Sequence, residues 1–320
     1  MVMVNLEDCC EILDSIRVPI TASKREEGEY PYYGANGVQD YVSEYLFDDE
    51  LVLLAEDGGN FGSKDKPIAY RVSGKCWVNN HAHVLKPNEN MNVDYLCYSL
   101  MFYNVSGMVN GATRKKLTQA AMRKMQIPLR GMEEQLHIVN QLNKICMIIE
   151  LRKQELQRLD DLIKARFVEM FGDSASNEKG WKMNTFGDIC TVRQGLQIPI
   201  SKRLTEYEED SYEYITVQYL HGGKEKEYIK SPKESVKCTK DDILMTRTGN
   251  TGMVVTNVEG VFHNNFFLID FDRERFEKDF LVEYLNLDLI QADITRRAGT
   301  STIPDLNHGE FYKIKVFEPP

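Results

Sequence analysis

A long stretch without helix-breaking residues constrains the fold of this chain more than any other feature. Residues 133–171 contain neither proline nor glycine, and Gly172 follows them as a stop signal. At 1.5 Å per residue, a single helix over this stretch would extend for roughly 58 Å. Apolar side chains recur along it in two heptad series, the first being Leu142, Ile149, Leu156, Ile163 and Met170 and the second Ile138, Ile145 and Leu159. So narrow an apolar stripe on so long a helix predicts a coiled-coil partner.

The segments before and after this stretch carry similar features in the same order. Residues 56–62 (EDGGNFG) and 247–252 (RTGNTG) each follow an apolar run, and aligning their G-N-x-G turns places Gly59 opposite Gly249. Further segment pairs keep this order: 77–87 with 261–271, 94–100 with 279–285, 110–119 with 297–306, and 124–129 with 313–320. The preserved order indicates a tandem duplication.

Together these two features predict an α+β fold. We expect two similar mixed α/β domains joined by a long, coiled-coil-forming helix. The expected boundaries are residues 1–131 for the first domain, 132–173 for the spacer helix and 174–320 for the second domain. Each domain should hold a mixed antiparallel sheet, with helices at residues 94–104 and 279–293. Residues 30–42 (YPYYGANGVQDYV) are typical of a strand, a glycine-rich turn and a second strand.

Composition narrows the classes of function. No apolar run is long enough to span a membrane, and the N-terminus lacks the basic region of a secretory signal. The seven cysteines are scattered without a C-x-x-C pair, which favours reduced thiols in a cytoplasmic protein and argues against a zinc site. Because the formal net charge is −10, any surface that binds nucleic acid must be a local cluster of cations.

Motifs of catalysis and cofactor binding do not occur in the sequence. The glycine-rich turns lack the spacing of a phosphate-binding loop, and no dinucleotide fingerprint, methyl-donor loop or nucleophile elbow is found. His81 and His83 have a spacing that suits metal ligands on one side of a strand, but the second copy has Phe266 and Leu268 at the aligned positions. We therefore expect packing positions there, no metal, no cofactor and no enzymatic activity of this chain alone.

Polar loops at corresponding places in both copies are the candidates for a binding role. Arginine can read guanine, lysine and hydroxyl groups contact phosphates, and asparagine can read adenine. The predicted contacts to double-stranded DNA are Tyr32, Tyr33, Asn36, Lys64, Thr113, Arg114, Lys115, Lys116, Arg193, Gln194, Gln197, Arg296, Arg297, Thr300 and Ser301. Taken singly, each cluster is equally typical of a solvated loop. Their recurrence in both copies favours nucleic acid.

The sequence resembles the DNA specificity subunit of type I restriction–modification enzymes over nearly its whole length. In the first copy the resemblance rests on CEILDSIRVPI, YPYYGANGVQDYV, VNNHAHVL, GATRKKLT and QIPLRGMEEQLHIV. In the second copy it rests on WKMNTFGDICTVRQGLQI, DDILMTRTGNTG, HNNFF and FEPP. The most specific of these features is IPL followed by EEQ and a long heptad helix.

This resemblance implies a role for each part of the chain. Two target recognition domains would each read one half of a split DNA sequence, and the helix would set their spacing and dock modification subunits. Chemistry would belong to the partners: a modification subunit brings S-adenosylmethionine and flips an adenine, and a restriction subunit cuts. The alternative is a tandem protein-interaction scaffold that uses its coiled coil for assembly and has no DNA role.

One departure from the family pattern concerns the end of the chain. The family has a second conserved helix after the second recognition domain, whereas this sequence ends at Pro319 and Pro320. We interpret the chain as a truncated subunit. The heptad face of residues 133–171 is then expected to pair with another chain.

Overall fold

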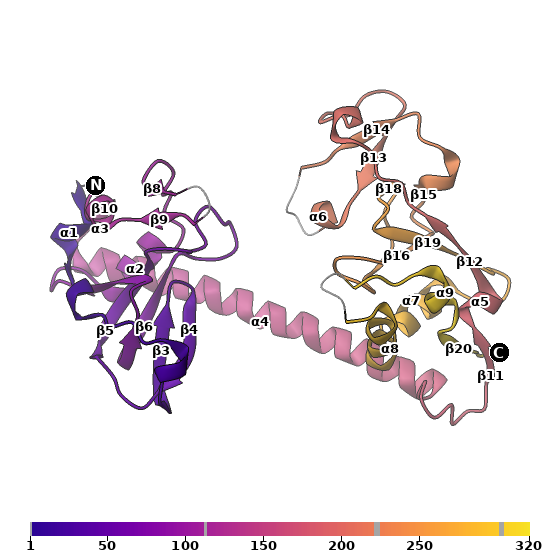
Figure 1. Ribbon diagram of the computed structural model, residues 1–320, viewed down its shortest axis with the longest axis horizontal. Coiled ribbons are helices and arrows are strands. Elements are labelled where there is room, and N and C mark those ends of the chain that lie inside the picture. The colour runs from indigo at the N-terminus through magenta and orange to yellow at the C-terminus, as the bar shows by residue number, and fades with distance from the viewer. Residues whose placement is uncertain (1, 112–113, 221–224, 301–303) are drawn as a thin grey trace. The chain divides into compact units, whose positions relative to one another are not determined.

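The computed structural model describes residues 2–111, 114–220, 225–300 and 304–320. Two compact units divide the chain, Met1–Lys153 and Gln154–Pro320, which we call unit 1 and unit 2. Figure 1 labels the elements of both. They are mixed α/β units, and a long helix is present, which confirms the predicted α+β class.

The sheet of unit 1 is built around strand β5, whose second half is buried. The described strands are β1 (Val2–Asn5), β2 (Cys10–Ile12), β3 (Glu27–Gly34), β4 (Gly37–Val42), β5 (Phe47–Ala55), β6 (Ala69–Val78), β7 (Ala82–Pro87), β8 (Val109–Asn110), β9 (Lys116–Leu117) and β10 (Gln126–Leu129). The described helices are α1 (Leu6–Cys9), α2 (Val93–Met101) and α3 (Gln119–Arg123), with the 3-10 turns η1 (Asp14–Ile16) and η2 (Ala22–Lys24).

Six strands of unit 1 lie in the order β2-β7-β5-β6-β3-β4. The apolar run of residues 51–55 is buried on both faces of β5, as such a run predicts for a central strand. Helix α2 packs against β5 and β6 (Figure 1). Strands β3 and β4 form the hairpin predicted at residues 30–42, and β3 runs parallel to β6.

Unit 2 distributes its strands over smaller sheets. The described strands are β11 (Lys182–Thr185), β12 (Cys190–Gln194), β13 (Ser211–Ile215), β14 (Tyr228–Lys230), β15 (Lys237–Cys238), β16 (Ile243–Thr246), β17 (Val254–Val255), β18 (Gly260–Phe262), β19 (Phe266–Phe271) and β20 (Lys315–Glu318). The described helices are α5 (Phe186–Ile189), α6 (Val217–Leu220), α7 (Lys278–Leu285), α8 (Asp288–Ala298) and α9 (His308–Tyr312), with 3-10 turns η3 (Ile200–Lys202) and η4 (Glu234–Val236). The sheet orders are β12-β19-β16-β17, β14-β13-β18-β15 and β11-β20.

The helix expected at residues 279–293 is in fact two helices, α7 and α8. Between them Leu287 adopts an extended backbone with φ −63° and ψ 138°. Its side chain is buried in the core of unit 2, and the Asn286 amide group donates to the Val282 carbonyl at 3.0 Å. Burial of Leu287 therefore breaks the helix at a place where the sequence contains no proline or glycine.

The two units repeat one arrangement of strands and side chains. In each, a tyrosine hydroxyl accepts the backbone N–H of an isoleucine at 3.0 Å, from Ile20 to Tyr32 in unit 1 and from Ile198 to Tyr214 in unit 2. An arginine guanidinium lies over each tyrosine ring. The predicted duplication is thus visible in the fold as well as in the order of motifs.

The backbone register corrects one detail of the sequence alignment. Leu117 donates its N–H to the Glu56 carbonyl, and Leu306 donates to the Arg247 carbonyl in the same way. This pairing makes Glu56 equivalent to Arg247, and it therefore places Gly58, and not Gly59, opposite Gly249. Gly58 and Gly249 both have positive φ, +62° and +83°, which glycine adopts without strain.

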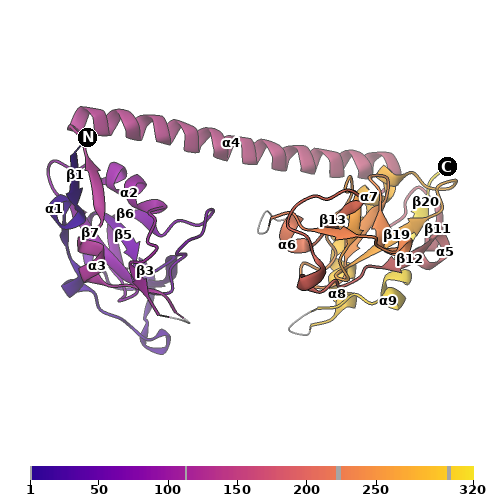
Figure 2. The same ribbon diagram turned by 90° about the horizontal axis from the view of Figure 1, so that it is seen from above.

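Helix α4 extends over Met132–Phe171, 40 residues, as the sequence predicts (Figure 2). Gly172 ends it with φ +87° and donates its N–H to the Val168 carbonyl at 2.7 Å. Near its start, the fully buried Gln135 side chain accepts from the Asn92 N–H at 2.8 Å and donates to two carbonyls of unit 1. The first turns of α4 therefore belong to the core of unit 1.

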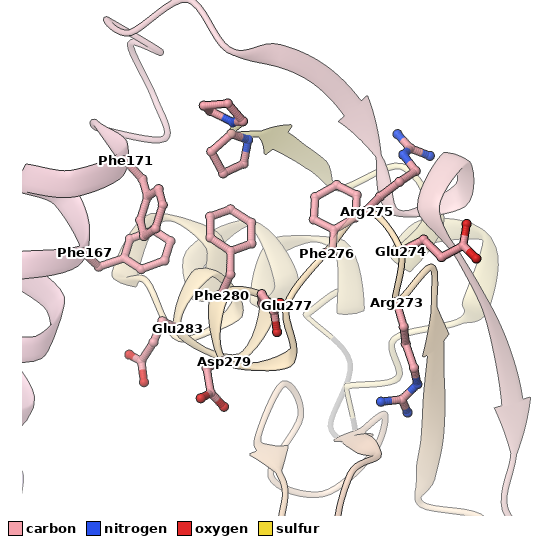
Figure 3. A pocket seen from close by; sticks show the side chains of 12 residues that line it. Phe167, Phe171, Arg273, Glu274, Arg275, Phe276, Glu277, Asp279, Phe280 and Glu283 are labelled. Atoms are coloured by element: carbon pink, nitrogen blue, oxygen red, sulfur yellow. The ribbon is translucent and has the colours of Figure 1, made fainter.

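The last turns of α4 are anchored in unit 2 by aromatic packing. Phe167 and Phe171 meet Phe280 of α7 with ring centroids 5.4 and 5.0 Å apart (Figure 3). Of the residues predicted to pair α4 with another helix, Ile138 packs against the core of unit 1 and Leu142 is half-buried. Ile138 is therefore not available for such pairing. The others are exposed: Ile145, Ile149, Leu156, Leu159 and Ile163.

Candidate nucleic-acid interface

In unit 1, predicted site residues gather at the turn that follows β5. Asn36, in the β3–β4 turn, donates its amide N–H to the Gly58 carbonyl at 3.0 Å. Arg114 contacts the Asp57 carboxylate at 2.6 Å, and the His81 ring lies 2.7 Å from the same oxygen. Gly58 donates its backbone N–H to the Lys115 carbonyl at 3.2 Å. Four segments distant in the sequence thus meet at one polar surface, which we call the β5 turn cluster.

The cations of the β5 turn cluster differ in how firmly they are engaged. The Arg114 side chain is 60% exposed in spite of its ion pair with Asp57. Lys115 is exposed as well. Lys116 contacts Glu56 at 2.9 Å, and this pairing raises the pKa of the Lys116 ammonium group above its ordinary value. Arg114 and Lys115 are therefore the cations of this cluster best placed to meet an anion from solvent. Lys64, in the loop between β5 and β6, is a further exposed cation of unit 1.

Unit 2 places a different set of charges at the equivalent turn, after β16. Arg247 forms a two-pronged ion pair with Asp305, at 2.8 and 2.7 Å. It also donates to the side-chain amide oxygen (Oε1) of Gln194 at 3.1 Å, and the His308 ring contacts the same oxygen at 2.8 Å. Burial and the neighbouring Arg247 charge lower the pKa of His308, so its neutral ring donates through Nε2–H.

The remaining predicted residues of unit 2 do not form one cluster. Arg193 is half-buried and donates to the Ser235 carbonyl, whereas Gln197 and Thr300 are exposed. Arg296, exposed on α8, pairs with Asp293. Arg297 is only 17% exposed in its side chain and lies between Asp293 and Glu310, at 2.7 and 3.3 Å. Arg297 therefore links α8 to α9 and is poorly placed to contact a ligand from solvent.

The prediction that Tyr32 contacts DNA is wrong for this structure. Its side chain is 1% exposed, and its hydroxyl is engaged with the Ile20 backbone. Successive residues of a strand face opposite sides, so one tyrosine of the YPYY run points into the core. Tyr33 is half-buried against Tyr70, with ring centroids 5.7 Å apart. Thr113 and Ser301 lie outside the described residues.

The two histidines of the H-x-H motif do not share a site. His81 pairs with Asp57, whereas the buried His83 lies near Asp14 and Glu56, whose carboxylate oxygens and His83 nitrogen are within 4.8 Å of one another. Arg17 contacts Glu56 at 2.6 Å and Asp14 at 3.4 Å, and Lys116 contacts Glu56. Because these cations already neutralise both carboxylates, the group has the geometry of a buried ion cluster and not of a metal centre.

Several residues at both turns were not among the predicted contacts. They are Asp57 and His81 in unit 1, and Arg247, Asp305 and His308 in unit 2. Arg247 stands at the start of RTGNTG, a stretch interpreted only as a turn. The signal that could have found it is its position directly after a buried strand, where side chains of neighbouring segments converge. The other residues depend on pairing between segments that are far apart in the sequence.

The fold and these clusters define a class of protein. Two repeated α/β units each place a polar cluster at the end of the corresponding strand, and one helix contributes to the cores of both units. None of the described helices has the length and apolar character needed to cross a membrane. Such duplication of a unit is typical of proteins that bind an extended partner at two places.

Comparison with known proteins identifies the family. The family model of the type I restriction modification DNA specificity domain matches residues 1–161 and 178–320. The chain therefore belongs to this family. A solved S subunit of a type I restriction–modification system from M. genitalium has a similar fold, with a TM-score of 0.56 and 14% sequence identity over 98% of this chain and 83% of that one.

Curated relatives share parts of the sequence. A putative type I restriction enzyme specificity subunit of Haemophilus influenzae is 36% identical over 143 residues, which is 45% of this chain and 37% of the relative. The EcoprrI specificity subunit of Escherichia coli is 25% identical over 39% of this chain and 30% of the relative. The MjaIX subunit of Methanocaldococcus jannaschii is 24% identical over 49% of this chain and 41% of the relative. This chain therefore matches less than half the length of each of these relatives.

Proposed function

We propose that this chain is a non-catalytic DNA-recognition subunit of a type I restriction–modification enzyme. In this proposal residues 1–131 and 174–320 each read one half of a divided target, and residues 132–173 set their spacing. The observation that carries the proposal is that each unit has a polar cluster at the end of a corresponding strand, β5 in unit 1 and β16 in unit 2. The backbone hydrogen bond at this place is the same in both units, whereas the side chains around it differ. Membership of the DNA specificity domain family supports it.

The proposal assigns the chemistry to partner subunits. Modification subunits would dock on the spacer helix and supply S-adenosylmethionine, and restriction subunits would join through them. The specificity subunits among the curated relatives support this assignment. A chain with a net charge of −10 can bind DNA only through local cations, and the exposed Arg114, Lys115 and Lys64 meet that requirement in unit 1.

A double substitution at the β5 turn cluster tests the proposal. Arg114→Ala with Lys115→Ala should weaken binding of a duplex selected from a random library by about tenfold or more. The slope of log K against log salt concentration should become shallower by about two, because two phosphate contacts are lost. Lys116 is kept because it pairs with Glu56. Fluorescence anisotropy titrations at several salt concentrations measure both quantities.

The matched control removes two cations from the middle of α4, by Lys153→Ala with Arg158→Ala, both exposed. It has the same change in net charge and should retain affinity and salt slope. Equal losses in both variants would show a general charge effect, and an unchanged affinity in the first would remove the cluster from the interface. If no duplex is retained with or without a modification subunit, the scaffold alternative is favoured.

We propose in addition that α4 pairs with a second copy of the chain. Its middle exposes Ile145, Ile149, Leu156, Leu159 and Ile163, a stripe that an isolated helix in water does not favour. Light scattering should therefore show a dimer at micromolar concentration, and Ile149→Glu with Leu156→Glu should yield a monomer with unchanged helix content. A monomeric unaltered chain would contradict this part of the proposal.

A further inference from the structure

The buried ion cluster beneath the β5 turn cluster contains a histidine with an unusual pair of neighbours. His83, in β7, is 0% exposed. Its Nδ1 lies 2.7 Å from the Asp14 carboxylate, and its Nε2 lies 2.9 Å from the Leu117 carbonyl oxygen. Both neighbours are thus oxygen atoms within hydrogen-bond distance of a ring nitrogen.

These two neighbours define the protonation state of the ring. A carbonyl oxygen can only accept, and the Asp14 carboxylate already accepts from the Val84 N–H and from Gln119, both at 2.9 Å. Burial opposes ionisation of Asp14, but the bonds and charge of its partners, His83 first, hold the pKa of Asp14 below its ordinary value. With an acceptor on each side, both ring nitrogens must donate, which is the imidazolium form.

Charged and polar groups surround His83 on several sides. The groups that face it are Asp14, Glu56 and Arg17, each at most 12% exposed in its side chain, together with Gln119 and, from the solvent side, Lys116. Arg17 and Lys116 balance the two carboxylates, so the assignment of the ring rests on its two acceptor neighbours and not on the charge count.

The Leu117 carbonyl connects this cation to the candidate DNA contacts. Leu117 is buried, and its N–H donates to the Glu56 carbonyl at 2.7 Å. The His83 ring and the Glu56 backbone together therefore hold both polar backbone groups of Leu117. Arg114 and Lys115 lie three and two residues before Leu117, so the position of this anchor determines where their side chains emerge.

In unit 2 the equivalent pair of strand ends is held together by different side chains. His83 pairs with Leu54 of β5, and Phe267 pairs with Met245 of β16. The strand register therefore puts Phe267 in the place of His83, which corrects the sequence alignment of His83 with Leu268 by one residue. There the Leu306 N–H still donates to the Arg247 carbonyl, but the side-chain link is the ion pair of Arg247 with Asp305. The strand junction is thus repeated, whereas the histidine link is found in unit 1.

We propose that His83, held as an imidazolium between Asp14 and the Leu117 carbonyl, is a positioning residue for the DNA contacts of unit 1. The ring holds the carbonyl group of Leu117, at the end of the segment that carries Arg114 and Lys115. Replacing the ring would release this anchor in unit 1 and leave the Arg247–Asp305 link of unit 2 unchanged. The inference rests on the proposed function for its DNA consequence, but the charge state and the anchor can be measured without DNA.

The first experiment observes the ring directly in the full chain. Nitrogen-15 NMR of histidine-labelled protein, with His83→Gln to assign the signal, should show both His83 ring nitrogens protonated at pH 7. Hydrogen exchange at the amides of residues 115–117 should be about tenfold faster in His83→Gln than in the unaltered chain, which corresponds to about 1.4 kcal/mol. A neutral His83 ring at pH 7, or equal exchange in the two proteins, would overturn the proposal.

The second experiment connects the anchor to DNA binding. His83→Phe, which installs the residue of unit 2, should weaken binding of the selected duplex about tenfold and accelerate hydrogen exchange at residues 115–117, while the exposed His137→Gln should change neither. Equal affinity and equal exchange in the His83→Phe variant and the unaltered chain would contradict a positioning role. If the unaltered chain binds no duplex, the proposed function fails, and the NMR and exchange measurements still decide whether His83 is the charged anchor.

Discussion

Phe280→Ala is expected to destabilise unit 2 by about 3–5 kcal/mol, the usual effect of removing a buried phenylalanine from a packed core. Phe280 lies at the centre of an aromatic cluster that includes Phe167 and Phe171 of α4 (Figure 3). Phe317 of β20 belongs to the same cluster. A cavity of about 560 Å³ is already open beside these rings. Solvent can therefore reach the space left by the lost ring, and the end of α4 loses its main contact with unit 2.

Tryptophan fluorescence can follow this effect in unit 2 alone. Trp181 donates its indole N–H to the Phe171 carbonyl at 2.7 Å, so it reports on the end of α4. The chain has two tryptophans, and a Trp77→Phe background leaves Trp181 as the reporter. Urea unfolding should show the loss in Phe280→Ala, whereas Leu289→Ala, an exposed position on α8, should change stability by less than about 0.5 kcal/mol. Similar midpoints for both variants would contradict the packing role assigned to Phe280.

Asp14→Ala should destabilise unit 1 by about 3–5 kcal/mol, because breaking a buried charged network leaves its other members unpaired. The Asp14 carboxylate accepts from His83, from the Val84 N–H and from Gln119, and its removal leaves three donors without that acceptor. Unfolding monitored by Trp77, in a Trp181→Phe background, measures the loss. Asp8→Ala, at an exposed position, is the matched control.

The effect of Asp14→Ala should depend on pH in a defined direction. The folded-state pKa of Asp14 is lowered, so its stabilising contribution is complete above the ordinary aspartate range, near pH 4, and is lost as pH falls through the lowered value. The difference in the free energy of unfolding between the unaltered chain and the variant should therefore be constant around neutral pH and become smaller in acid. A difference that grows on acidification would contradict this assignment of the Asp14 charge.

Local features of the sequence predicted much of the architecture. The absence of proline and glycine in residues 133–171, with Gly172 after them, predicted α4 almost to the residue. The order of similar motifs predicted two related units. These features could be read because helix formation and termination depend on residues that are neighbours in the sequence.

The candidate site was less accessible to sequence analysis. Asn36, Arg114 and Lys115 lie in polar loops, as predicted, whereas Lys116 lies in the short strand β9. Nothing in the sequence placed Asn36 beside Gly58 or Lys116 against Glu56. Tyr32 was wrongly included because it looks like its neighbour Tyr33, and only the pleat of β3 decides which ring is buried. DNA contact by the remaining residues stays a prediction.

The sequence by itself determined that this chain has two related units and one long helix, because those features follow from local propensity and from repetition. The tertiary structure decided which charges meet. Glu56 and Lys116, like Arg247 and Asp305, are brought together by pairing between strand ends that lie about 60 residues apart, so their contact depends on the register of the whole sheet. The same register places a buried histidine in unit 1 and a phenylalanine in unit 2 under equivalent junctions.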